Sequence, residues 1–419
     1  MYRRMAARLK NSETRKLLEN FIALSVLQLG NFILPLITLP YLARVLGVKL
    51  FGTLAFAAAV VTYFQAIVDY GFHYTAVRDI ARRRDDVAAV SRIFFSVLYA
   101  RLLLMVVSFL ILCLLIVTVP VFYRNSGILL LTFLLIPGHV LFPEWFFQAM
   151  ERMKYIALLN FSAKLFFTVM VFFVIRSQAD YFYHPVLAAS GYAVSGLVSL
   201  VIIKRHFGIP FVLPALREVG QTIWNGTSMF LNVFLPNFYS NINAVFLGIF
   251  NTDRGVGVFD AANRFITISS VLTTLISRVF FPYLARHPKK HGVFVMISFV
   301  TSLMLSLLFF FGADLIVYVF YTDEFRDAAT LLRIMAITPL LFFLLNAYGT
   351  NFLVLHNREA VLRNIIVAAS VLGFFLSLTM ILLFGYRGAA ISLVLTRGLM
   401  GTFTYLSARR VQLLEIDQK

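Results

Sequence analysis

Long apolar runs alternate along this chain with short polar connections. Each run is about twenty residues long, and a helix of that length spans the roughly 30 Å hydrocarbon core of a bilayer at a rise of about 1.5 Å per residue. The pattern predicts twelve membrane-spanning helices. They lie at residues 18–42, 51–70, 93–117, 127–147, 156–175 and 185–203, and then at 222–250, 256–282, 293–312, 328–354, 364–384 and 388–408.

Composition indicates the same fold class, an all-α integral membrane protein. Of the 419 residues, 60% are hydrophobic and only 13% are Asp, Glu, Lys or Arg, whereas about 25% are charged in an ordinary soluble domain. A soluble fold cannot hide that much apolar surface.

The basic residues form a topology signal. The net charge of +18 alone would suggest a nucleic-acid partner, but 24 of the 37 Lys and Arg fall in odd-numbered tails and connections, 7 in even-numbered ones and 6 within spans. Because cytoplasmic loops collect Lys and Arg, this alternation predicts that both termini are cytoplasmic. It also argues against nucleic acid as a partner.

The sequence lacks the motifs of enzymatic chemistry. None of the nine lysines follows a glycine, which excludes a phosphate-binding loop for ATP, and no glutamate follows a histidine, which excludes a zinc-protease motif. The lone cysteine, Cys113, excludes disulfides within the chain. We therefore expect a carrier or channel, not an enzyme, with no metal or cofactor. Coupling to an ion or a proton stays open, and the sequence does not identify the ion.

Polar residues inside spans are costly, so they mark candidate sites. The first and seventh helices each carry amides and a proline at helical spacing: Gln28, Asn31 and Pro35, and then Asn225, Asn232, Pro236 and Asn243. Such stripes either line a water-filled cavity or hold helices together. The sequence leaves both roles open.

The eighth helix has the most continuous polar face, formed by Asp260, Arg264, Thr267, Thr274 and Arg278. Arg264 lies about 15 Å below the outer end by helical rise, too deep to reach the surface easily. It therefore requires water, cargo or a partner. The alternative to a cavity role is an internal ion pair with Asp260, one turn away.

Lys164 lies similarly deep in the fifth helix, on one face with Asn160 and Thr168, and we expect it to line a cavity. Structural roles are expected for the other embedded basic residues, Arg101, Arg333 and Arg397. Acidic residues deep within spans are nearly absent from the sequence. The cavity is therefore predicted to be cationic and its cargo anionic.

A short internal repeat divides the chain. FGTLAFAAA from Phe51 aligns with VGVFDAANR from Val256 and matches Gly52 with Gly257. We predict two six-helix lobes around a central cavity, an arrangement that many carriers use for alternating access. The predicted order is a cytoplasmic tail (1–17), the first lobe (18–203), a cytoplasmic linker (204–221), the second lobe (222–408) and a cytoplasmic tail (409–419).

A set of motifs carries a family resemblance: NFILPLITLPYLARVLG from Asn31, FG at Phe51, DYGF at Asp69, AVRDIA at Ala76 and PEWFFQAMERMKYI at Pro143. The set resembles Wzx-type O-antigen flippases of the MOP superfamily of polysaccharide, lipid and drug exporters. The resemblance is strong in the first half and weak in the second. His73 and Ala149 depart from the family's usual Asn and Gly.

The resemblance implies a MATE-like carrier of the bacterial inner membrane. It would move an undecaprenyl-diphosphate-linked oligosaccharide, such as the O-antigen unit of lipopolysaccharide, from the cytoplasmic to the periplasmic leaflet through a V-shaped cavity. The residues selected to face this cavity are Gln28, Asn31, Asn225, Asn232 and Arg264. Arg264, Lys164 and Arg278 would bind diphosphate or acidic sugars. Gating or packing roles are expected for Asp69, Arg78, Asp260, Pro35 and Pro236.

Two other functions stay open. A cation-coupled multidrug antiporter of the same superfamily would be expected to carry deep acidic residues. A membrane-embedded polymerase or ligase for the same lipid-linked sugar would be expected to carry catalytic clusters. We expect a monomer that contacts the lipid-linked glycan and membrane lipid, with a polysaccharide polymerase and chain-length proteins as candidate partners.

Overall fold

Apolar runs of this length fold as helices in a bilayer because a helix satisfies its own backbone hydrogen bonds. The computed structural model describes residues 12–238 and 241–417, and the regular elements in those ranges are all helical, which confirms the predicted fold class. The elements of the first half are α2 (Ser12–Asp69), α3 (Phe72–Ala81), α4 (Val87–Thr118), α5 (Pro120–Arg124), α6 (Ser126–Phe133), α7 (Leu135–Leu141), α8 (Glu144–Ala149), α9 (Met153–Val174), η1 (Gln178–Phe182) and α10 (Tyr183–His206). Those of the second half are α11 (Leu216–Phe238), α12 (Ile242–Phe250), α13 (Asp253–Arg286), η2 (Pro288–Lys290), α14 (His291–Phe311), α15 (Ala313–Phe320), η3 (Asp323–Phe325), α16 (Asp327–Met335), α17 (Thr338–Leu344), the π-helix η4 (Leu345–Leu353) and α18 (Glu359–Asp417).

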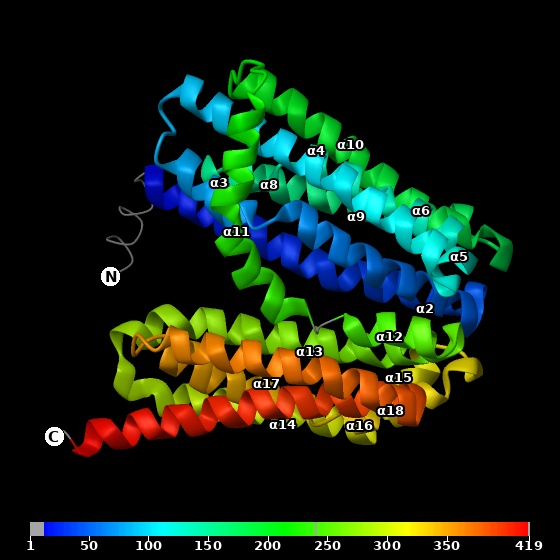
Figure 1. Cartoon of the computed structure of the whole chain (residues 1–419). Coiled ribbons are helices and arrows are strands. Elements are labelled where there is room, and N and C mark those ends of the chain that lie inside the picture. Colours follow the sequence, from blue (N-terminus) through cyan, green and yellow to red (C-terminus); the bar gives the residue numbers. More distant parts are fainter. Residues whose placement is uncertain (1–11, 239–240, 418–419) are drawn as a thin grey trace. The chain divides into compact units, whose positions relative to one another are not determined.

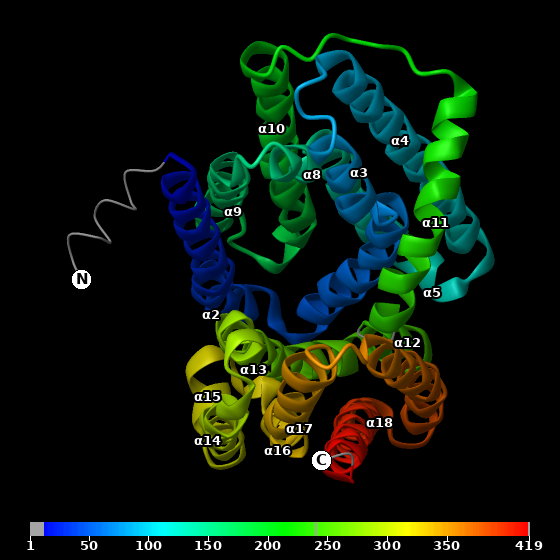
Figure 2. The same cartoon turned by 90° about the vertical axis from the view of Figure 1, so that its left-hand side faces the viewer.

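The chain folds into two units whose limits differ from the predicted lobes. The first unit contains the residues up to Val45 and then Val60–Phe234, and the second contains Leu46–Ala59 and the residues from Leu235 onward. The prediction had placed 46–59 in the first lobe and 222–234 in the second. Within the first unit α9 and α10 lie side by side, and within the second α13, α14, α17 and α18 form a bundle (Figures 1 and 2).

Among the described residues, nine helical stretches are long and apolar enough to cross a membrane. Two of them, Leu34–Ala81 and Glu359–Leu413, have 48 and 55 residues, so each is as long as two spans. Each bends at a glycine: Gly47 has φ 69° and Gly385 has φ 56°. Because a Cβ atom disfavours this left-handed region, glycine suits both bends. The bends separate the first predicted span from the second and the eleventh from the twelfth.

Two predicted spans each consist of several shorter helical elements. The fourth consists of α6, α7 and α8, with Pro137 inside α7 and Pro143 directly before α8. The tenth consists of α16, α17 and the π-helix, with Pro339 in the first turn of α17. Proline interrupts a helix because it lacks an amide hydrogen and its ring clashes with the preceding turn. The described part of the seventh consists of α11 and α12, on either side of residues 239–240.

The two glycines matched by the internal repeat meet in the second unit. A Cβ atom on Gly52 would lie 1.7 Å from the carbonyl oxygen of Asp253, and one on Gly257 would lie 2.2 Å from the carbonyl oxygen of Val48. The helices α2 and α13 therefore cross in backbone contact, which small residues allow in membrane helices. Beside the bend, the amide of Val48 donates to Oε2 of Glu324 at 2.9 Å. These contacts fix this part of α2 to the second unit.

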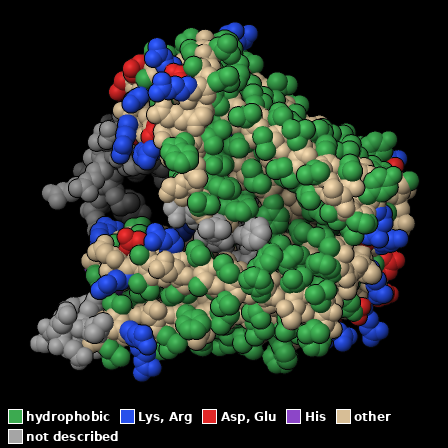
Figure 3. Space-filling model, viewed as in Figure 1, with side chains coloured by type: hydrophobic (Ala, Val, Ile, Leu, Met, Phe, Trp, Pro, Cys, Tyr) green, Lys and Arg blue, Asp and Glu red, His purple; other side chains and the backbone are tan. Residues whose placement is uncertain are grey.

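The surface of the helices suits a lipid environment. Large apolar side chains such as Leu110 and Leu114 on α4 and Phe173 on α9 are exposed. In Figure 3 hydrophobic side chains cover the flanks of the helices, and Lys and Arg gather near helix ends. With no water in the hydrocarbon region, such exposed apolar flanks carry no hydrophobic penalty.

A buried hydrogen-bonded cluster joins α12 to α18 in the second unit. Oδ1 of Asn243 accepts hydrogen bonds from the hydroxyls of Ser377 and Ser392, the latter at 3.0 Å. All three side chains are buried. The last amide of the predicted stripe on the seventh helix therefore has a packing role, whereas Asn225 of the same stripe is exposed on α11 in the first unit.

Replacing Asn243 with alanine is expected to lower the free energy of unfolding by about 2 kcal/mol, because buried hydroxyls lose their acceptor. Thermal unfolding of the purified protein in detergent measures the effect. Asn225→Ala is the matched control and should leave the transition unchanged. An equal loss in both variants would contradict a stabilising role for the cluster.

Candidate functional site

The predicted polar face of α13 is built around an ion pair in the second unit. Nε of Arg264 donates to Oδ2 of Asp260 at 2.7 Å, one helical turn away. The side chain of Arg264 is 41% exposed and that of Asp260 is 22% exposed. The ion pair between Asp260 and Arg264 is therefore present, and a cavity role for Arg264 stays a prediction. Part of the Arg264 side chain nevertheless remains exposed on a long membrane helix.

Aromatic rings position this ion pair from a second side. The guanidinium carbon of Arg264 lies 5.1 Å from the ring centroid of Phe51, within cation–π distance. The ring of Phe51 in turn meets Tyr321 edge to face, with centroids 6.2 Å apart. The hydroxyl of Tyr321 donates to the carbonyl oxygen of Ala261 at 3.0 Å. The aromatic contacts and the carboxylate together restrict the rotamers of Arg264.

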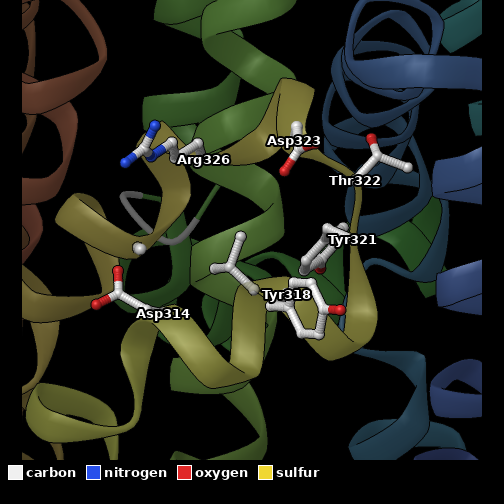
Figure 4. A pocket seen from close by; sticks show the side chains of 8 residues that line it. Asp314, Tyr318, Tyr321, Thr322, Asp323 and Arg326 are labelled. Carbon is white, nitrogen blue, oxygen red and sulfur yellow. The ribbon is translucent and has the colours of Figure 1, made fainter.

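Tyr321 also forms part of a polar pocket of about 600 Å³ between α15, η3 and α16. In Figure 4, Asp314 and Arg326 lie on one side of this pocket, and Tyr321 and Thr322 on the other. Asp314 is paired with Arg333 of α16. Carboxylates, an arginine and tyrosine rings thus gather beside the ion pair of α13.

The rest of the polar face on α13 differs from the prediction in detail. The hydroxyls of Thr267 and Thr274 donate to carbonyl oxygens one turn earlier in the same helix, at 2.9 and 2.7 Å. Their hydrogen bonds are therefore satisfied within the helix, which threonine often does in apolar surroundings. Arg278 is exposed.

Lys164 lies on α9 in the first unit, near an acidic residue that is distant from it in the sequence. The amide Nδ2 of Asn160 donates to Oε1 of Glu144 at 2.7 Å, and Lys164 interacts electrostatically with the same carboxyl group. Glu144 is the first residue of α8. The pairing connects residues 16 and 20 positions apart, so helical spacing could not reveal it.

The other embedded basic residues also have partners. Arg101 donates through Nη2 to Oδ1 of Asp69 at 2.5 Å, with only 5% of its side chain exposed. Arg397 lies over the ring of Phe342, with its guanidinium carbon 4.1 Å from the centroid. Because Arg264, Arg101 and Arg333 pair with carboxylates, the embedded charge is more balanced than the sequence indicated.

The predicted amide stripes are only partly described. The side chains of Gln28 and Asn31 on α2, and of Asn232 and Pro236 on α11, lie outside the described residues. Pro35 is exposed on α2. Asn225 lines a polar pocket of about 350 Å³ between α3, α4 and α11.

The residues predicted for gating or packing take different positions. Asp69 belongs to the buried ion pair with Arg101, whereas Arg78 is exposed and pairs with the adjacent Asp79 at 2.8 Å. Sequence reasoning missed Glu144 as a candidate. The available signal was a carboxylate directly after a proline inside an otherwise apolar stretch.

Comparison with known families and proteins bears on these features. The model of the family described as "Polysaccharide biosynthesis protein" matches residues 17–288. The "Putative O-antigen transporter" of Escherichia coli K12 is 28% identical over 412 residues, covering 96% of this chain and 99% of that protein. Another protein of that name, from Shigella dysenteriae, is 22% identical and covers 92% of this chain and 98% of its own length.

Solved structures show the same fold. Lipid II flippase MurJ in an inward closed conformation aligns with a TM-score of 0.73 at 12% identity, covering 93% of this chain and 87% of that one. An inward-facing MATE family transporter of the MOP superfamily aligns with a TM-score of 0.65 at 16% identity, covering 94% and 99%. Since the family match covers more than half of the 419 residues, this chain belongs to the polysaccharide biosynthesis protein family and has the fold of MOP-superfamily transporters.

Proposed function

We propose that this chain moves an undecaprenyl-diphosphate-linked oligosaccharide, an O-antigen or similar repeat unit, from the cytoplasmic to the periplasmic leaflet by alternating access. Membership of the polysaccharide biosynthesis family supports this, as do two relatives whose names describe O-antigen transport. The polar head of such a cargo has to cross the hydrocarbon region, while its lipid tail stays in the bilayer.

The observation that carries the proposal is the partly exposed side chain of Arg264 on a membrane helix. A charged group deep in a membrane helix is costly unless water or a polar ligand meets it. Asp260 pairs with Arg264 at 2.7 Å. A diphosphate carries more charge than one carboxylate and accepts the two parallel hydrogen bonds that a guanidinium offers. Cargo binding would therefore exchange one partner of Arg264 for another.

Translocation in proteoliposomes tests the proposal, with a labelled undecaprenyl-diphosphate oligosaccharide whose glycan becomes protected from an external reagent when it crosses. Arg264→Ala is expected to slow translocation about tenfold or more, because a hydrogen bond to a charged group contributes about 1.5–3 kcal/mol. Arg264→Lys keeps the charge without the planar fork and should be intermediate. The matched control is Arg254→Ala. Arg254 lies on α13, as Arg264 does, and its replacement removes an exposed ion pair with Asp327 of α16.

Each alternative function gives a different result in the same assay. Cleavage or extension of the glycan without its movement would indicate that the chain is a polymerase or ligase and not a carrier. Movement of organic cations but not of the lipid-linked glycan would indicate that the chain is a multidrug antiporter. Normal translocation by the Arg264→Ala variant would show that Arg264 does not bind the cargo.

Several further assignments belong to the same proposal. The other residues proposed to line the cargo path are Lys164, Arg278, Gln28, Asn31, Asn225 and Asn232. The protein is proposed to act as a monomer in the bacterial inner membrane, with both termini cytoplasmic and with a polysaccharide polymerase and chain-length proteins as partners. Reporter fusions at each terminus test the orientation: activity of a periplasm-dependent reporter at either end would contradict it.

A further inference from the structure

A small polar cavity lies inside the first unit. Its volume is about 200 Å³, and it is lined by residues of α2, α3, α4, α7 and α8 together with the α7–α8 connection. Among these helices, α3 and α8 lie side by side (Figures 1 and 2). A water molecule occupies about 30 Å³ in the liquid, so the cavity suits a few small polar occupants rather than a sugar chain. The lining residues used below are Asp69, His73, Arg101, His139, Glu144 and Trp145.

Asp69 and Arg101 form an ion pair in the cavity. Asp69 accepts from Arg101 at 2.5 Å, and the arginine side chain is 5% exposed. Adding a proton to Asp69 would leave a nearly buried guanidinium without its counter-ion, which is costly. This pair is therefore suited to holding α2 to α4 and is a poor proton acceptor.

Glu144 is in a different situation. It is partly buried, lines the cavity, and accepts one hydrogen bond from Asn160 of α9 at 2.7 Å. Removal from water disfavours its carboxylate, whereas the amide of Asn160 and the positive charges of Lys164 and Arg101 favour it. The protonation state of Glu144 therefore depends on the groups that surround it.

Two polar atoms beside Glu144 lack hydrogen-bond partners among the described residues. Trp145 lines the cavity with 3% of its surface exposed, and its Nε1 has no partner there. Oε1 of Gln148, one turn further along α8, is also buried without a partner. Buried donors and acceptors are normally paired. An unpaired donor and acceptor next to a carboxylate are typical of a site for a polar occupant rather than of close packing.

The remaining titratable groups around the cavity are His73, His139 and Tyr192, the last of which interacts electrostatically with Glu144. His73 of α3 is exposed and interacts electrostatically with Glu144. His139 of α7 stacks against Tyr192 of α10, with ring centroids 4.0 Å apart. With both histidines neutral, the charges of Asp69, Arg101, Glu144 and Lys164 sum to zero. One added proton changes that balance.

We propose that this cavity is a proton-binding site in which Glu144 takes up one proton from water, and that exchange of this proton is coupled to transport. The carboxylate becomes a carboxylic acid: an O–H bond forms on Glu144, the O–H bond of the hydronium ion that gives up the proton breaks, and a water molecule is left. It weakens the hydrogen bond from Asn160 and leaves one positive charge in the cavity. Because that hydrogen bond joins α8 to α9, protonation changes how these two helices contact each other.

The binding part can be tested without cargo because the chain has only two tryptophans, Trp145 and Trp224. Trp224 is 79% exposed, so Trp224→Phe leaves the cavity residue as the only tryptophan reporter. The fluorescence of Trp145 in the purified, full-length Trp224→Phe protein is measured from about pH 4 to pH 9, a range that begins near the ordinary pKa of a glutamate. We expect a transition with the steepness of one proton, and its loss in Glu144→Gln.

His73→Gln and His139→Gln, each in the Trp224→Phe background, are the matched controls and should retain the transition with a shifted midpoint. Infrared difference spectroscopy gives an independent reading, since a protonated carboxylic acid has its own carbonyl band. That band should appear on acidification and be missing in Glu144→Gln. A transition that survives Glu144→Gln, or the absence of both signals in the parent protein, would overturn the proposal.

The coupling part rests on the proposed function and is measured separately. Translocation of the lipid-linked oligosaccharide in proteoliposomes is expected to respond to an imposed pH gradient, and Glu144→Gln is expected to lose that response. If the parent protein titrates but moves no glycan, the proposed cargo is wrong while the proton site stands. If Glu144→Gln retains the full response to the gradient, the proton site is not coupled to transport.

Discussion

Gly52→Ala is expected to destabilise the protein by about 3 kcal/mol, at the upper end of the usual cost of overpacking. The new Cβ atom would lie 1.7 Å from the carbonyl oxygen of Asp253 and 2.7 Å from the amide nitrogen of Gly257. Both neighbours are backbone atoms, so relief requires α2 and α13 to move apart along the whole crossing. Thermal unfolding in detergent and the yield of folded protein in the membrane measure the effect.

Gly257→Ala tests the same crossing from the other side, since its Cβ atom would lie 2.2 Å from the carbonyl oxygen of Val48. The matched control is Gly292→Ala on α14, where a Cβ atom would have no neighbour within 4 Å. Because alanine favours a helix over glycine by about 1 kcal/mol, the control should be neutral or slightly stabilising. Similar melting temperatures for all three variants would contradict backbone contact at this crossing.

Asp69→Ala is expected to cost about 3 kcal/mol, because it leaves the guanidinium of Arg101 buried without its counter-ion. The lower end of the usual range applies, since the side chain of Asp69 is itself 45% exposed. Replacing both partners by apolar residues, Asp69→Leu with Arg101→Met, should restore most of the stability, because no unpaired charge is then left behind.

The control for this pair is Asp79→Ala, which removes the exposed partner of Arg78. Ion pairs at the surface contribute little, so its unfolding transition should stay near that of the parent protein. If the double variant is as unstable as Asp69→Ala alone, the loss comes from packing around Asp69 and not from the uncompensated charge.

The apolar pattern was sufficient to predict the fold class because a bilayer restricts a single chain of apolar runs to helices. The pattern could not predict where helices break. Pro137 and Pro143 divide the fourth span, whereas Pro35 and Pro40 lie inside the part of α2 before its bend at Gly47 without dividing it. Whether a proline divides a membrane helix depends on whether neighbouring groups satisfy the freed backbone carbonyls, and a single sequence does not contain that information.

Helical spacing predicted one part of the candidate site and missed another. The pair of Arg264 and Asp260 is a local i, i+4 contact and was available as an alternative from the sequence. Arg101 with Asp69 and Asn160 with Glu144 join different helices, 32 and 16 residues apart. Such pairs depend on tertiary packing. The sequence therefore indicated an excess of embedded cations because acids were counted only when they lay deep within a span. Acids elsewhere in the chain also pair with the embedded arginines.

The division of α2 between two units has a consequence for exchanging parts between relatives. Residues 46–59 belong to the second unit, although residues before and after them belong to the first. A chimaera joined only in the connection after α10 would combine this segment with a foreign partner surface on α13. We expect hybrid proteins to fold well only when residues 46–59 and the residues from Leu235 onward come from the same parent, so the exchangeable module is discontinuous in the gene.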